Sequence, residues 1–204
     1  MRGFVGWVAM LLVSLWTASA TAQNSKAEGA MAQAPVLIPV TNSAKDIEIM
    51  LAGLLQQKFR LESSLIPVND DPDNLRLHIP IGADEKQGIP RVLCVIDTAV
   101  VARNKDGNAI SQTITIAATA DHDFTQEQMP KLLQWANVWN ARMIPIRIFI
   151  ADNRVYTAMS ILVTASEPTS ADRVVGSFLG VARAWAAVMQ DLRVNKILPA
   201  MKTR

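Results

Sequence analysis

Between residues 125 and 193 the spacing of apolar residues changes from helical to alternating and back to helical, and this change constrains the fold more than any other feature. The first helical face is formed by Leu132, Trp135, Ala136 and Trp139. Alternating side chains follow over 146–163, interrupted by a turn at Asp152-Asn153, which is the pattern of a β-hairpin. Helical spacing returns over 174–192, with Thr169 or Ser170 as the cap. This segment therefore predicts a helix, an antiparallel hairpin and a long helix.

An earlier helix is predicted to begin near Ser43. Asp46 follows three residues later, the spacing at which a serine hydroxyl can cap the first helical turn. Apolar residues then recur at intervals of three and four: Ile47, Met50, Leu51, Leu54, and Lys58 or Phe59. We expect this stripe to face the core.

Strands are predicted over 75–81, 92–101 and 110–118. Pro80 places the first at a sheet edge or near a strand end, because proline lacks the amide hydrogen of a ladder bond. The second is apolar on both faces, as in a central strand. A turn over 104–108 leads to the third, which carries Ser and Thr on one face. The order helix, strands, helix, hairpin, helix predicts an α+β fold, with a mainly antiparallel sheet and helices packed on one face.

Residues 1–22 are predicted to be a cleavable secretory signal peptide. Arg2 precedes an apolar stretch over 4–16, and Ala-x-Ala sites allow cleavage before Thr21 or, as we expect, after Ala22. A retained membrane anchor is the alternative, but the stretch has 13 residues and a helix needs about 20 to cross a bilayer. We expect a periplasmic or secreted protein with no stable membrane insertion after cleavage.

Three segments follow the signal peptide in this interpretation: a flexible linker over 23–42, an α+β domain over 43–195 and a C-terminal tail over 196–204. The linker is rich in Ala and Gln, and two prolines near its end block a continuous helix. Its last residues, Val36–Val40, could instead add to a sheet as an edge strand or bind another surface.

The charge and cysteine content exclude some classes of partner and of covalent structure. The chain has 20 basic and 18 acidic residues, and the basic residues are scattered, so a nucleic-acid partner is not expected. Cys94 is the only cysteine, which prevents an internal disulfide. It lies in an apolar run and is predicted to be an inert core residue, with intermolecular pairing as the alternative.

Few residues carry the pattern of a catalytic or metal site. The best metal candidates are Asp121, His122 and Asp123, whose side chains are common ligands. Consecutive residues cannot converge on one ion in an extended strand, so we expect neither metal nor cofactor. Acidic residues over 69–74 lack the ligand spacing of a calcium loop and are interpreted as a solvated turn. We find no nucleophile elbow and no phosphate-binding loop, and an enzyme is not expected.

The sequence LLQWANVWN over 132–140, followed by the hairpin and the closing helix, resembles the YbjN domain family. That family is described as bacterial sensory transduction regulators. The resemblance covers about a third of the chain and implies a fold like that of type III secretion chaperones. It also implies self-association as a homodimer and a surface that binds partner polypeptides. The predicted export signal departs from the family pattern and speaks against a cytoplasmic signalling role.

Asn137, Trp139 and Asn140 are the candidate partner-binding residues within this resemblance. Capping is the competing role for Asn140, because asparagine amides bond the free carbonyls at helix ends. Trp135, Trp139 and Trp185 are predicted to be core residues whose indole N–H groups need partners. We expect an exported, non-catalytic interaction module. The alternatives are a small metal-assisted hydrolase and a sensor of a small ligand or of envelope stress.

Overall fold

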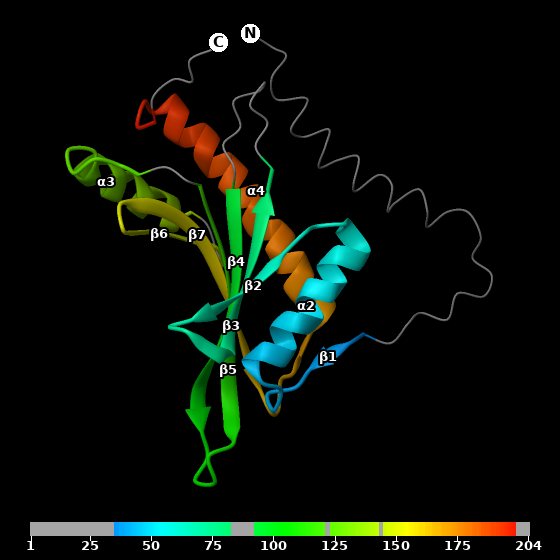
Figure 1. The fold of residues 1–204 in the computed structure, drawn as a ribbon. Coiled ribbons are helices and arrows are strands. Elements are labelled where there is room, and N and C mark those ends of the chain that lie inside the picture. The colour runs from blue at the N-terminus through cyan, green and yellow to red at the C-terminus, as the bar shows by residue number, and fades with distance from the viewer. Residues whose placement is uncertain (1–34, 83–91, 121–122, 143–144, 199–204) are drawn as a thin grey trace. The chain divides into compact units, whose positions relative to one another are not determined.

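The structure, a computed structural model, describes residues 35–82, 92–120, 123–142 and 145–198. Within these residues a six-stranded sheet has the order β2-β3-β4-β5-β7-β6, and all neighbouring strands are antiparallel (Figure 1). The strands are β2 (Ser64–Val68), β3 (Asp71–Ile81), β4 (Val92–Arg103), β5 (Ala109–Ala120), β6 (Arg147–Ala151) and β7 (Arg154–Thr164). The helices are α2 (Ala44–Phe59), α3 (Met129–Asn140) and α4 (Ala171–Val194), and a two-stranded sheet joins β1 (Leu37–Ile38) to β8 (Thr169–Ser170). The predicted α+β class and the order of elements are confirmed.

Two of the helices begin at the serines that the sequence indicates. The backbone N–H of Asp46 donates to Ser43 Oγ over 3.1 Å at the start of α2. Ser170 Oγ accepts from the N–H of Arg173 over 3.1 Å at the start of α4. Each hydroxyl satisfies one amide that has no partner inside the helix. The sequence therefore determines both helix starts locally.

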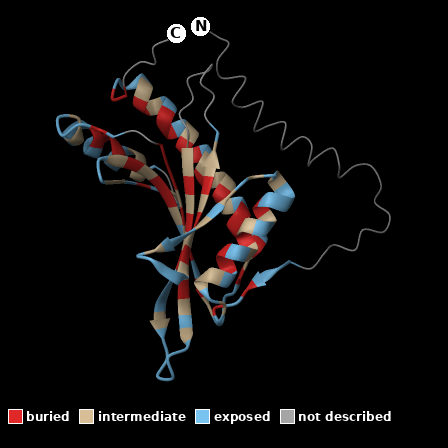
Figure 2. Ribbon diagram, in the orientation of Figure 1, coloured by how far each residue is buried: buried red, intermediate tan, exposed pale blue. Residues whose placement is uncertain are grey.

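Helices α2 and α4 pack on the same face of the sheet. Helix α2 contacts β3 and β4, α4 contacts β5 and β7, and the two helices contact each other (Figure 1). Figure 2 shows buried positions alternating along the strands and following one side of each helix. The fully buried side chains of this core include Leu51, Leu55, Leu77, Ile79, Ile96, Ile114, Ile116 and Phe178. Burial of these large apolar groups is the main stabilising contribution to the fold.

The opposite face of the sheet is not covered by α2 or α4. Thr113 and Thr115 of β5 are half-buried there, and Leu162 of β7 is 58% exposed. The rings of Phe149 and Tyr156 stack on this face with centroids 4.8 Å apart. The predicted polar face of the third strand is therefore the open face of the sheet.

The sheet splits between β3 and β4, and α2 bridges the split. The two strands pair from Ile81 and Val92 only as far as Arg76 and Asp97. Beyond that point Lys45 Nζ of α2 contacts Asp73 Oδ1 at 3.0 Å on one side. Glu48 Oε1 accepts the backbone N–H of Thr98 over 3.1 Å on the other side. Glu48 thus satisfies an amide of β4 that β3 leaves unpaired.

The boundaries predicted for the linker and the tail are wrong in part. Ile38 and Val40 are buried, and Gln112 Nε2 donates over 2.7 Å to the carbonyl oxygens of both Val40 and Asn42. The end of the predicted linker is therefore held on the sheet, and β1 is the edge strand that was the alternative. At the other end Ile197 and Leu198 are buried in the core, so the domain extends past residue 195. The predicted signal peptide lies outside the described residues.

The acidic segment over 69–74 is the turn between β2 and β3 and the start of β3, and its first five residues are exposed. Asn69 and Asp70 have φ angles of 53° and 60°, the left-handed conformation that asparagine and aspartate tolerate in tight turns. The interpretation as a solvated turn is confirmed. Strand β2 was not predicted, because Pro67 and the absence of clear alternation hide it in the sequence.

Candidate functional site

A groove of about 440 Å³ lies between α3 and the C-terminal end of α4. One wall is formed by one side of α3 and by Arg142, which follows that helix. The other wall is formed by the last turn of α4 and the residues that follow it. The lining residues are Lys131, Gln134, Trp135, Val138, Trp139, Arg142, Asp191, Asn195 and Ile197. The volume lies within the range of sites that hold small ligands or short peptide segments. Of the predicted partner-binding residues, Trp139 lines this groove, and Asn137 and Asn140 do not.

Asp191 fixes both tryptophans of the groove. Its Oδ2 accepts the indole N–H of Trp135 over 2.6 Å and that of Trp139 over 2.7 Å. The two rings lie 5.9 Å apart at an interplanar angle of 48°. The indole N–H groups of Trp135 and Trp139 therefore have the expected partner within the chain. Since one carboxylate oxygen holds both rings, the groove walls are ordered before any ligand arrives, which lowers the entropy lost on binding.

The exit of α4 is tied to α3 by two further hydrogen bonds. Gln128 Nε2 donates to the carbonyl oxygen of Ile197 over 3.0 Å. Lys131 Nζ donates to the carbonyl oxygen of Asn195 over 2.9 Å. A lysine at these free carbonyls also interacts favourably with the negative end of the helix dipole. These bonds hold the two sides of the groove together.

Asn140 does not cap α3, as the sequence suggested, but bonds strand β6. Its Nδ2 donates to the carbonyl oxygen of Ile148 and its Oδ1 accepts the N–H of Ile148, each over 2.7 Å. The side-chain amide therefore bonds β6 as an adjacent strand would, and it covers part of the sheet edge. Ala141, not Asn140, is the C-cap of α3. Asn137 is exposed on α3 and does not line the groove.

Of the three metal candidates, Asp123 is the one that lies in the described part of the chain. Asp121 and His122 lie outside the described residues. Asp123 Oδ1 accepts the guanidinium Nε–H of Arg154 over 2.6 Å. Within the described ranges no group of three His, Cys, Asp or Glu side chains has the geometry to hold a metal ion, and no helix there is long and apolar enough to cross a bilayer.

Two buried ionisable groups have strongly shifted pKa values. Burial raises the pKa of the Cys94 thiol to about 12, and the side chain is fully enclosed as predicted. Burial also raises the pKa of Glu48 to about 8. The hydrogen bond from the N–H of Thr98 and the positive charge of Arg76 oppose this increase, and the negative charge of Asp97 adds to it. Glu48 is fully buried and so holds α2 on the sheet instead of contacting a substrate. The sequence predicted the first of these groups but not the second.

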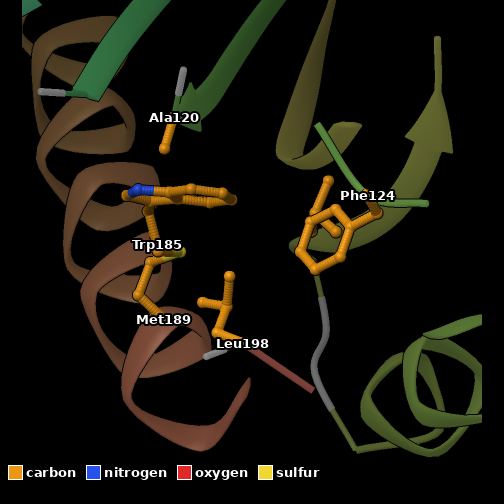
Figure 3. A pocket seen from close by; sticks show the side chains of 6 residues that line it. Ala120, Phe124, Trp185, Met189 and Leu198 are labelled. Atoms are coloured by element: carbon orange, nitrogen blue, oxygen red, sulfur yellow. The ribbon is translucent and has the colours of Figure 1, made fainter. Parts of the chain in front are cut away.

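Trp185 lies beside a small apolar cavity of about 10 Å³, which is also lined by Ala120, Phe124, Val155, Met189 and Leu198. Figure 3 shows the indole nitrogen of Trp185 at the end of the ring system away from Phe124. This buried nitrogen has no hydrogen-bond partner among the described residues. The cavity has room for about one water molecule at most. It is a packing gap at the end of the core and not a ligand site.

Comparisons with family models, curated proteins and solved structures gave no match for this chain. The likeness of 132–192 to the YbjN family therefore stays a resemblance, and the groove has to be interpreted from its own geometry.

Proposed function

We propose that this protein is an exported, non-catalytic interaction module of the bacterial envelope, and that it binds a partner polypeptide in the groove between α3 and α4. Export is proposed from the pattern of residues 1–22. The YbjN resemblance adds a regulatory or chaperone-like role and self-association as proposals of the same kind.

The ordering of two tryptophans by one carboxylate carries the proposal. Tryptophan is enriched among the residues that contribute most to protein interfaces. Trp139 is half-buried, and Val138 beside it is 45% exposed, so a partner side chain can reach an apolar surface. Because Asp191 already satisfies both indole N–H groups, a partner does not need to supply acceptors for them. Such a surface favours binding through an apolar anchor.

Affinity capture from the native envelope tests this proposal with a matched pair of variants. Val138→Asp places a negative charge in the groove. Ile49→Asp is the control, because it places the same charge on α2, outside the groove, where the Ile49 side chain is 48% exposed. We expect the wild type and Ile49→Asp to recover the same partner and Val138→Asp to lose it. Equal recovery by both variants would contradict binding in the groove.

A sensor of a small ligand is a second candidate, favoured by the groove volume of about 440 Å³. A ligand that prefers the folded state raises the apparent melting temperature in proportion to the logarithm of its concentration. A low-molecular-mass fraction of the native envelope that stabilises the wild type but not Val138→Asp would favour this role. A protein partner lost in the same variant would favour the interaction module.

A further inference from the structure

The groove between α3 and α4 has a cation at each end. Lys131, Trp135, Val138 and Arg142 are spaced by four, three and four residues, which places them along one side of α3 and its exit. The separation of Lys131 and Arg142 is roughly 16 Å, from a helical rise of about 1.5 Å for each residue. The apolar part of the groove lies between these two charges.

Neither cation is neutralised by an acidic group in the described part of the chain. Lys131 Nζ contacts a carbonyl oxygen, that of Asn195, and no ion pair involves it within residues 35–82, 92–120, 123–142 and 145–198. The Arg142 guanidinium is exposed and has no ion pair with those residues either. Asp191 is the one carboxylate that lines the groove, and its single negative charge leaves the two cations in excess. The charge of the groove therefore favours an anionic occupant.

We propose that the groove selects an extended polypeptide segment with an apolar centre and an acidic side chain on each flank, one for Lys131 and one for Arg142. An extended chain advances about 3.3 Å for each residue, so five steps span the two cations. A helix would need three turns, about eleven residues, for the same span, so a short segment reaches both cations only in the extended conformation. This inference rests on the proposed function and names the chemistry of the partner.

Fluorescence anisotropy with three labelled hexapeptides tests the charge selection. The probes are Glu-Ser-Leu-Leu-Ser-Glu and its versions with Gln or Lys at both ends. Two exposed ion pairs contribute roughly 1.4 kcal/mol together, and we expect the Glu peptide to bind about tenfold more tightly than the Gln peptide. The preference should weaken as salt is added, because exposed charges are screened. Equal binding of the Glu and Gln peptides would overturn the inference.

A charge reversal at the two cations supplies the second arm. The double variant Lys131→Glu with Arg142→Glu should prefer the Lys peptide, and the control Lys105→Glu with Arg183→Glu, which changes two exposed cations elsewhere, should keep the preference for Glu. Because Lys131→Glu also removes a hydrogen bond to the exit of α4, Arg142→Glu alone is measured as well and should lose about half of the preference in free energy. A Glu preference that survives the double reversal would overturn the inference.

The peptide assay and the envelope capture distinguish this inference from the proposed function. If no probe binds but a partner sensitive to Val138→Asp is recovered, the acidic partner chemistry is wrong and binding in the groove stands. If the Glu probe binds selectively and no partner is recovered, the selectivity stands and the proposed role in the envelope is contradicted.

Discussion

The side-chain amide of Asn140, at the end of α3, pairs with the backbone of Ile148 in β6 through two hydrogen bonds of 2.7 Å. The helix that carries the groove is thereby joined to the edge of the sheet. An exposed strand edge is a template for unwanted pairing with other chains. The contact therefore positions α3 and also protects β6, and it connects the stability of the groove to that of the sheet.

Asn140→Ala should lower the free energy of unfolding by about 1–2 kcal/mol, because two half-buried backbone groups of β6 lose their partner. Urea denaturation measures the change. Asn137→Ala, on the exposed side of the same helix, is the control and should stay within about 0.5 kcal/mol of the wild type. Equal effects of the two substitutions would show that the contact with Ile148 does not contribute to the free energy of unfolding.

Asp191→Ala should destabilise the chain by about 2 kcal/mol, because two indole donors then lack an acceptor in a poorly solvated place. The indole proton resonances of Trp135 and Trp139 should also move upfield in NMR spectra. Asp172→Ala, which removes an exposed ion pair with Lys58, should cost less than about 1 kcal/mol. Unchanged indole resonances in Asp191→Ala would contradict the shared acceptor.

Glu48 should make stability fall as the pH rises. The folded chain holds its proton up to a pKa of about 8, compared with an ordinary value of 4.5. Between these values unfolding releases a proton, so the free energy of unfolding falls by up to about 1.4 kcal/mol for each pH unit and levels off above the folded pKa. Glu48→Gln cannot titrate and should lack this decline.

The measurement is urea denaturation of the wild type and of Glu48→Gln at several pH values from about 5 to 9, a range that covers the titration. The variant should gain stability relative to the wild type as the pH increases, because Gln keeps an oxygen for the N–H of Thr98 and carries no charge. Parallel pH profiles of the two proteins would show that Glu48 titrates normally.

Cys94 should resist thiol reagents while the chain is folded. Its pKa is raised to about 12 by burial, and the thiolate is the reactive form. At pH 8 the rate of labelling should therefore follow the rate of unfolding, and labelling should become rapid in denaturing urea. Rapid, complete labelling of the folded protein would place the thiol at the surface.

The starts of α2 and α4 and the hairpin were predicted correctly, because interactions between residues close together in the sequence determine them. The hairpin of β6 and β7 follows from alternation around Asp152 and Asn153, whose φ angles are 49° and 59°, as a tight hairpin turn requires. Ser43 and Ser170 cap their helices through groups only three residues away. In both cases the interacting residues are neighbours in the chain.

The features missed by sequence reasoning depend on residues far apart in the chain. Asp191 meets Trp135 and Trp139, which precede it by 56 and 52 residues, and no periodicity indicates such a contact. Glu48 follows Ile47 on the buried side of α2. A charged residue at such a position interrupts the apolar pattern of the helix and does not indicate a buried contact. Only the contact with Thr98, 50 residues later, shows why a carboxyl group is tolerated there. The groove is therefore visible only in the folded chain.

Site-specific photocrosslinking tests groove binding most directly. A photoreactive amino acid replaces Val138 in one version of the full chain and Ile49 in another, at helix positions of similar exposure, 45% and 48%. Each version is expressed in the native host and irradiated in intact cells. The account predicts one discrete protein adduct from position 138 that is absent from position 49 and becomes weaker when Arg142→Glu is added. No adduct at position 138, or the same adducts at both positions, would contradict it.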